Sequence, residues 1–425
     1  NCTLRANAFT KTGYAFQGWA TSASGSVAYN NSQTVKNLTS TNGATVNLYA
    51  KWGANTYTIA YNANGGTGTT SSTLCTYDQN CTLRSNGFTK TGYTFQGWAT
   101  SASGSVVYSN GQSVKNLKTS GTITLYAVWK ANTYTVKYYA NNGSGTMSDT
   151  TCTYDQNCTL RTNAFTRTGY TYQGWATSAS GGVAYTNGEV VKNMAASGTV
   201  NLYAKWNANG YTIAYNSNGG SGSMSNTSCT YGSSCTLRAN SFSRSGYTFA
   251  GWATSASGSS VYTNSQSVSN LATSGTVTLY AKWNGNGYYI AYNSNGGTGS
   301  MSNTSCTYGN SCTLRANAFT RVGYTFAGWA TSASGSSVYT NSQSVSNLAT
   351  SGTKTLYAVW TANSYSIAYN SNGGTGSMLA TSCTYGSSCT LRANSFTRSG
   401  YTFAGWATSA SGSIAYSGNQ SVSNY

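Results

Sequence analysis

The sequence predicts a mainly β protein: a tandem array of small modules of about 77 residues that together form an elongated rod or fibre. Three observations lead to this prediction. One motif recurs at a fixed spacing along the whole chain, which is typical of repeat architectures. Short segments alternate large and small side chains with a period of two residues, as strands do, and no segment carries an apolar stripe with the 3.6-residue period of a helix.

The recurring motif sets the module length. Cys-Thr-Leu-Arg begins at Cys2, Cys81, Cys158, Cys235, Cys312 and Cys389, so that from Cys81 on the copies are 77 residues apart. The segment Gly-Tyr-x-[Phe/Tyr]-x-Gly-Trp keeps the same spacing and ends at Trp19, Trp98, Trp175, Trp252, Trp329 and Trp406. A second tryptophan closes the modules at Trp52, Trp129, Trp206, Trp283 and Trp360. We therefore divide the chain into modules 1 to 6, which are residues 1–54, 55–131, 132–208, 209–285, 286–362 and 363–425.

Both ends of the sequence fall inside a module. We expect module 1 to lack a first strand and module 6 to lack a last strand. The two pieces overlap in the module positions that they cover, which favours a window of a longer array over two halves that complete each other. Modules 4 and 5 are nearly identical in sequence, which indicates a function that depends on number and length. Near-identical neighbours also permit the exchange of strands between modules.

Two strands frame each module. In module 2, residues 57–61 alternate large and small side chains and run into the turn residues Asn64-Gly65-Gly66, which predicts a strand followed by a tight turn. In the closing segment of module 1, Val46, Leu48, Ala50 and Trp52 fall on one face, which predicts a second strand in the same sheet. The Ser- and Gly-rich residues 21–26 predict a loop, and a short helical turn is the most that we expect near the Gly-Trp segment.

The composition predicts a core built from aromatic rings. Aliphatic side chains are sparse, whereas the chain has 36 Tyr and 11 Trp, each of which can bury about 150 to 250 Å². The tryptophans are therefore expected to form the cores, although a Tyr or Trp platform for sugar rings is the alternative. No apolar run is long enough to span a membrane as a helix.

Enzymatic catalysis is improbable on the residues available. The chain has no His, and its only carboxylates are Asp78, Asp149, Asp155 and Glu189. Most general acid and base catalysis needs His or paired carboxylates. We therefore predict a protein that is not an enzyme and that needs no cofactor or metal.

The motifs resemble a known repeat family. Gly92-Tyr93-Thr94-Phe95-Gln96-Gly97-Trp98, the later Thr124-Leu125-Tyr126-Ala127-Val128-Trp129 and the Asn-Gly-Gly turn look like the Listeria-Bacteroides repeat, or internalin B-repeat, over the whole chain. The resemblance implies small β-grasp-like modules in tandem on secreted or surface-anchored bacterial proteins, often as stalk or adhesin segments. The chain departs from the family in having no proline before Gly-Tyr and in carrying a cysteine pair.

The cysteines fall into pairs with five residues between them: Cys75 and Cys81, Cys152 and Cys158, Cys229 and Cys235, Cys306 and Cys312, Cys383 and Cys389. The intervening residues are turn-like and can return the chain to disulfide distance. Disulfides are the favoured interpretation, with unpaired buried thiols as an alternative. Zinc is a poor fit because a structural site needs about four ligands. Disulfides and the family resemblance together predict an extracellular or cell-surface location.

The net charge of +18 is distributed over repeated positions. The first basic series is Arg5, Arg84, Arg161, Arg238, Arg315 and Arg392, and the second basic series is Lys11, Lys90, Arg167, Arg244, Arg321 and Arg398. On a regular array these would form two rows that attract anionic polymers or glycans, with solubility and local contacts to carbonyls as the alternative role. Candidate binding residues are Arg84, Lys90, Arg161, Arg167, Arg238, Arg244, Arg315 and Arg321. Nucleic acid is an improbable partner, because 22 basic residues in 425 is a thin density.

These observations together predict a non-enzymatic extracellular structural protein, a stalk or filament of disulfide-stapled modules that associate with one another. A cell-surface adhesin that binds glycans or anionic polymers through its basic and aromatic surfaces is the alternative.

Overall fold

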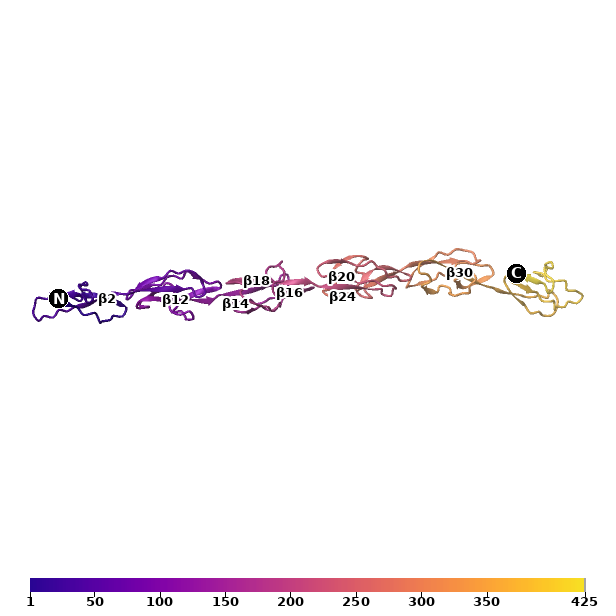
Figure 1. Cartoon of the computed structure of the whole chain (residues 1–425). Helices are drawn as coiled ribbons and strands as arrows, with labels where there is room; N and C mark the ends of the chain where they lie inside the picture. The colour runs from indigo at the N-terminus through magenta and orange to yellow at the C-terminus, as the bar shows by residue number, and fades with distance from the viewer. Residues whose placement is uncertain (424–425) are drawn as a thin grey trace. The chain divides into compact units, whose positions relative to one another are not determined.

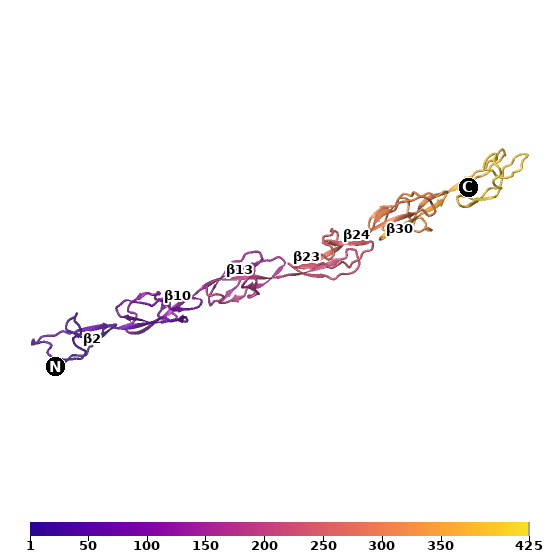
Figure 2. The same cartoon turned by 90° about the horizontal axis from the view of Figure 1, so that it is seen from above.

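The computed structural model describes residues 1–423, and within them every regular element is a β-strand (Figure 1). The prediction of a mainly β tandem array is confirmed. The chain divides into two compact units, Asn1–Ala208 (unit 1) and Asn209–Tyr425 (unit 2), which are described separately. Within unit 1, the strands labelled β2, β10 and β13 in Figure 2 belong to three successive modules.

Module 2 illustrates the sheet of a whole module. Its strands are β5 (Thr56–Asn62), β7 (Thr73–Thr76), β10 (Tyr93–Ala99) and β12 (Gly121–Ala131), in the sheet order β10-β12-β5-β7. The opening strand β5 and the closing strand β12 pair in parallel at the centre, and the two outer pairings are antiparallel. The prediction that both framing strands share one sheet is thus correct, and this sheet draws all its strands from one module.

The other whole modules repeat this sheet. Module 3 contains β13 (Thr133–Tyr139), β14 (Thr150–Thr153), β16 (Tyr170–Ala176) and β18 (Gly198–Ala208). Module 4 contains β19 (Gly210–Asn216), β20 (Thr227–Thr230), β22 (Tyr247–Ala253) and β24 (Gly275–Gly285). Module 5 contains β25 (Gly287–Asn293), β26 (Thr304–Thr307), β28 (Tyr324–Ala330) and β30 (Gly352–Ala362).

Modules 1 and 6 form smaller sheets. In module 1, β2 (Tyr14–Ala20) pairs with β4 (Tyr49–Ala54), and in module 6, β31 (Ser364–Ile367) pairs with β32 (Thr381–Thr384). A short ladder next to the Cys-Thr-Leu-Arg motif recurs as β1 (Cys2–Thr3) with β3 (Thr34–Val35), β8 (Cys81–Thr82) with β11 (Ser113–Val114), β15 (Cys158–Thr159) with β17 (Val190–Val191), β21 (Ser234–Thr236) with β23 (Ser267–Ser269), β27 (Ser311–Thr313) with β29 (Ser344–Ser346), and β33 (Ser388–Thr390) with β34 (Ser421–Ser423). Module 2 adds β6 (Thr67–Gly68) with β9 (Phe88–Thr89).

A fully buried tryptophan forms the centre of each whole module. In module 2, Trp98 has no exposed surface, and Tyr61 and Phe95 lie against it with ring centroids 4.7 and 4.9 Å away. Ile59 and Leu125, from the two central strands, are equally buried in the same cluster. The prediction that these tryptophans serve as core is confirmed.

The Gly-Trp segment is part of a strand, so the short helical turn allowed there does not form. β10 pairs with β12 along this segment and carries a bulge between Phe95 and Gly97. Gly97 has φ +149°, and a Cβ there would lie 2.5 Å from a methyl group of Val106 and 2.7 Å from the carbonyl oxygen of Tyr108. The glycine therefore allows the close approach of a neighbouring loop to the bulged strand.

The closing tryptophan ties the predicted Asn-Gly-Gly turn to the sheet. Trp129 donates from Nε1 to the carbonyl of Ala63 at 2.8 Å. Asn64 adopts a left-handed conformation, φ +48°, and its side chain donates to the carbonyl of Ala127 at 2.9 Å. The turn after the opening strand is thus bonded to the closing strand.

Candidate functional site: the module joint and the basic series

The structure joins the two cysteines of each predicted pair. Their Cα atoms lie 5.6 to 5.8 Å apart, and the disulfides are Cys75–Cys81, Cys152–Cys158, Cys229–Cys235, Cys306–Cys312 and Cys383–Cys389. The first cysteine of each pair is buried at the core, whereas Cys2 is exposed and unpaired. Each bond closes a short loop of five residues, which we call the disulfide loop.

Within each unit, the disulfide loop contacts the preceding module. Its tyrosine packs edge-on against the tyrosine of the preceding module's Gly-Tyr segment, with ring planes 74° to 82° apart. The pairs are Tyr14–Tyr77 (6.0 Å between centroids) and Tyr93–Tyr154 (5.9 Å) in unit 1, and Tyr247–Tyr308 (5.3 Å) and Tyr324–Tyr385 (5.8 Å) in unit 2. We call this contact between consecutive modules the joint.

Backbone hydrogen bonds connect the modules at the same place. Between β12 and β13 a single residue, Asn132, interrupts the strand. Its N–H donates to the carbonyl of Gly92 at 2.9 Å, and its carbonyl accepts from the N–H of Tyr154 at 2.8 Å. The hydroxyl of Thr94 donates to the Asn132 side chain at 2.6 Å. Asn286 makes the equivalent bonds in unit 2. The joint is therefore ordered by the backbone as well as by the rings.

Glycine leaves the space in which the tyrosine of the disulfide loop sits. Gly92 has φ +76°, and a Cβ at this position would lie 2.3 Å from the ring of Tyr154. At Gly13, Gly92, Gly246 and Gly323 the glycine of the Gly-Tyr segment thus has two functions, a left-handed backbone conformation and room for a ring of the next module.

A carboxylate reinforces the joints of unit 1. Tyr93 donates its hydroxyl to Asp155 at 2.8 Å, and the amide of Asn193 donates to the other carboxylate oxygen at 2.7 Å. The hydrogen bond from Asn193, followed by that from Tyr93, lowers the pKa of Asp155, while the bond to Asp155 raises the pKa of Tyr93. Tyr14 and Asp78 repeat this arrangement. In unit 2, Gly309 takes the place of the aspartate and keeps only the backbone bond to Asn347.

In modules 1, 2, 4 and 5 the second basic series lies at a joint. Its cationic groups stack on the Gly-Tyr tyrosines of their own modules at 3.8 to 4.3 Å from the ring centroids: Lys11 on Tyr14, Lys90 on Tyr93, Arg167 on Tyr170, Arg244 on Tyr247, Arg321 on Tyr324 and Arg398 on Tyr401. In modules 2 to 5 these residues are partly buried. A stacked cation of this kind contributes about 0.5 to 1 kcal/mol at an exposed site.

The first basic series is exposed and lies in a different environment. Arg161 donates to the carbonyl of Asp149 at 3.2 Å, Arg238 to that of Asn226 at 3.2 Å, and Arg315 to that of Asn303 at 3.3 Å. Arg84 is held through its backbone N–H, which donates to the hydroxyl of Tyr61 at 2.8 Å. The two series are therefore not equivalent, and binding of anionic polymers by either of them stays a prediction.

The residues that form the joint were not predicted from the sequence. Tyr77 and its equivalents lie among the turn-like residues between the cysteines, and Asn55 and its equivalents stand between two strands without a predicted role. A pattern for both was present, since a tyrosine stands two residues after the first cysteine of every pair, and a single Asn separates two strand patterns.

The geometry defines a class of protein: a tandem-repeat protein whose consecutive modules are joined by specific ring contacts and backbone hydrogen bonds. Across residues 1–423, no three His, Cys, Asp or Glu side chains gather in a way that could hold a metal ion. Nor does this part of the chain contain a helix long and apolar enough to cross a membrane.

The chain belongs to the Listeria-Bacteroides repeat domain family, as the sequence resemblance predicted. The family model matches residues 1–51, 57–128, 134–205, 211–282, 288–359 and 365–425. The module boundaries drawn above stay a prediction, with each match falling inside one of the six ranges.

Two relatives come from Evansella cellulosilytica. One, named "Putative Gly-rich membrane protein", is 29% identical over 293 residues, which are 68% of this chain and 32% of the relative. The other, named "Putative membrane protein", is 30% identical over 288 residues, or 66% of this chain and 40% of the relative. The matched region thus spans less than half of the length of either relative.

Proposed function

We propose that the chain is a non-enzymatic extracellular structural protein, a stalk or filament segment made of disulfide-stapled modules. The observation that carries this proposal is the joint. A stalk needs a fixed orientation between consecutive modules. The joint restricts rotation between modules because it has a one-residue connection, two backbone hydrogen bonds and a packed pair of rings. Flexible Gly/Ser linkers would not do so.

Three further features support a location outside the cytoplasm. Disulfides persist in oxidising compartments and are rare in the cytoplasm, and each of modules 2 to 6 has one. The names of two relatives contain "membrane protein", which fits a protein at a cell surface. The repeat family, as its resemblance implied, is found on surface-anchored and secreted proteins.

Electron microscopy of the full chain tests the stalk proposal. With about 30 Å per compact module, we expect straight particles on the order of 150 Å long. Beads that bend freely between modules, or a compact globule, would refute the proposal. Lateral or end-to-end association of chains would appear in the same images as thicker or longer particles.

The second candidate function is binding of glycans or anionic polymers at a cell surface. The observation that favours it is the exposure of the first basic series on a chain with 22 basic and only 4 acidic residues. Binding on a glycan array that grows with the number of modules and falls with added salt is the expected result. A pure spacer would bind nothing there.

A further inference from the structure

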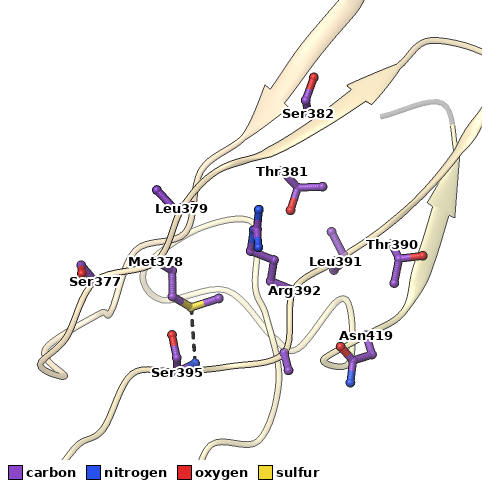
Figure 3. Close-up of a pocket in the computed structure, with 11 residues that line it drawn as sticks. Ser377, Met378, Leu379, Thr381, Ser382, Thr390, Leu391, Arg392, Ser395 and Asn419 are labelled. Atoms are coloured by element: carbon purple, nitrogen blue, oxygen red, sulfur yellow. Dashed lines mark hydrogen bonds between the residues drawn. The ribbon is translucent and has the colours of Figure 1, made fainter.

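A groove in module 6 is built around an arginine of the first basic series (Figure 3). Its volume is about 660 Å³, and its lining includes Ser377, Met378, Leu379, Thr381, Arg392 and Ser395. Figure 3 shows the guanidinium of Arg392 extending toward Thr381, which lies on the same segment as Met378, while Arg392 and Ser395 lie on the other segment. The sulfur of Met378 accepts a hydrogen bond from the backbone N–H of Ser395 at 3.5 Å, which ties the two segments together.

The same groove recurs in module 4. There it measures about 460 Å³ and is lined by Ser223, Met224, Arg238 and Ser241 among others. These residues stand two module lengths before Ser377, Met378, Arg392 and Ser395, and they are identical to them. The groove is therefore present in modules 4 and 6 with the same four residues.

Local structure fixes the arginine at the groove in both modules. The residue before it, Leu237 or Leu391, is buried in the core. Its own backbone N–H donates to a tyrosine hydroxyl, at 2.9 Å from Arg238 to Tyr215 and at 2.8 Å from Arg392 to Tyr369. The backbone of the arginine is thus anchored, while its side chain is exposed.

The basic side chains of unit 2 have no acidic side chain in the same unit to pair with. Residues 209–425 contain eight Lys and Arg residues and no Asp or Glu. A guanidinium there meets carbonyl oxygens, such as that of Asn226, but no carboxylate of its own unit. Guanidinium groups bind carboxylates through paired, charge-assisted hydrogen bonds, so an external carboxylate complements these grooves.

The rest of the lining favours a sugar as the carrier of that carboxylate. In module 6, hydroxyls of Ser377, Thr381 and Ser395 lie with the apolar side chains of Met378 and Leu379. In module 4, the apolar side chain of Met224 lies with the hydroxyls of Ser223, Ser225 and Ser241. A sugar ring presents both hydroxyls and a C–H face, and a groove of a few hundred Å³ holds a ligand of that size. A bare polyphosphate would make no use of the apolar wall.

We propose that the grooves at Arg238 and Arg392, together with the equivalent surface at Arg315, bind acidic sugar residues of a carboxylate-bearing polysaccharide, and that the second basic series does not. Module 5 carries the same Ser-Met pair at Ser300 and Met301, with Arg315 at the position of the groove arginine and Ala318 at the position of Ser395. Several weak grooves on one chain bind a polymer far more tightly than one groove alone. This proposal rests on the second candidate function, and the stalk proposal stands without it.

The test compares two triple variants of the full chain that lose the same charge. Arg238→Gln, Arg315→Gln and Arg392→Gln remove the groove arginines, and Arg244→Gln, Arg321→Gln and Arg398→Gln remove the stacked ones. Binding to immobilised polygalacturonate is measured by surface plasmon resonance, with polyphosphate as the second probe. Circular dichroism and thermal unfolding establish that both variants are folded.

The groove variant is expected to lose about tenfold or more of its affinity for polygalacturonate, because three of its multivalent contacts are removed. The stacked variant should stay within about twofold of the parent. Equal losses in the two variants would overturn the proposal in favour of binding by total charge. The proposal would also be overturned if the parent did not bind polygalacturonate, or if it bound polyphosphate more tightly through the same arginines. Neither result would change the particle shape in electron microscopy, which tests the stalk proposal separately.

Discussion

Substitution of Gly246 by alanine should loosen one joint without opening either module. Gly246 has φ +78°, and an added Cβ would lie 2.5 Å from the ring of Tyr308 in the next module. Carbon atoms in contact are normally about 3.5 to 4 Å apart, so the ring has to move. Because Tyr308 also packs on Tyr247, the substitution removes the ring contact of this joint.

The expected free-energy cost of Gly246→Ala has two parts, and a matched control variant separates them. An L-residue in the left-handed region costs about 1 to 2 kcal/mol, and Gly400, the equivalent residue in module 6, has the same φ of +78°. Among residues 1–423, nothing lies within 4 Å of a Cβ at Gly400, so in a chain of these 425 residues Gly400→Ala carries the backbone cost alone. The additional cost of Gly246→Ala is the lost ring pair, about 0.5 to 1.5 kcal/mol. If the ring pair contributes about 1.5 kcal/mol, its loss raises the population of open joints about tenfold.

The assay is a distance distribution between modules 4 and 5 in the full chain. Spin labels carried by non-cysteine amino acids replace Val261 and Val338, which are equivalent residues with 54% and 57% exposure. We expect a narrow distribution in the parent and in Gly400→Ala, and a broad one in Gly246→Ala. An unchanged distribution in Gly246→Ala, or equal broadening in both variants, would refute the claim that the ring contact orders the joint.

Three further predictions concern the disulfide, the carboxylate and the core. Reduction of the disulfides should destabilise each of modules 2 to 6 by about 2 kcal/mol, the chain-entropy value for so short a ring, and thermal unfolding with and without a phosphine reductant measures it. Acidification should loosen the joint of Asp155 but not that of Gly309. The lowered pKa of this aspartate means that its contribution is present above its unfolded pKa and is lost as the pH falls through the folded one; label distances across both joints at pH 7 and pH 2.5 check this. Tyr172→Phe should raise the melting temperature, because its buried hydroxyl finds no partner among residues 1–423 and the other whole modules have Phe there; a hydroxyl left unsatisfied in this way costs about 1 to 3 kcal/mol.

The sheet was predictable because its determinants lie close together in sequence. The alternation in residues 57–61 and the turn at Asn64-Gly65-Gly66 specify a strand and its end, and both are found in β5 and the turn after it. The burial of Trp98 followed from composition, since few aliphatic side chains are available for a core. The bulge at Gly97 was not predictable, because it depends on a loop ten residues away that approaches the strand closely.

The joint could be predicted only in part, for a different physical reason. Its partners, such as Tyr93 and Tyr154, are 61 residues apart in sequence, and each half taken alone has a local explanation as a turn. Only their juxtaposition reveals the contact. The two basic series pose the same problem, because Arg238 and Arg244 are both periodic cations in the sequence, and only the stacking of Arg244 on Tyr247 distinguishes them.

The joint also explains why near-identical modules can follow one another. Each whole module carries both halves of the contact, a Gly-Tyr segment for the module that follows and a disulfide loop for the module that precedes. Such a head-to-tail interface uses two different surfaces and does not close on itself. Modules 4 and 5 can therefore share almost one sequence and still meet through a specific contact, Tyr247 with Tyr308. Because the disulfide closes the loop that carries Tyr308, it orders the connection to the preceding module as well as its own module. A longer array can then arise by duplication of a module alone, because each new copy carries both surfaces that form the joint.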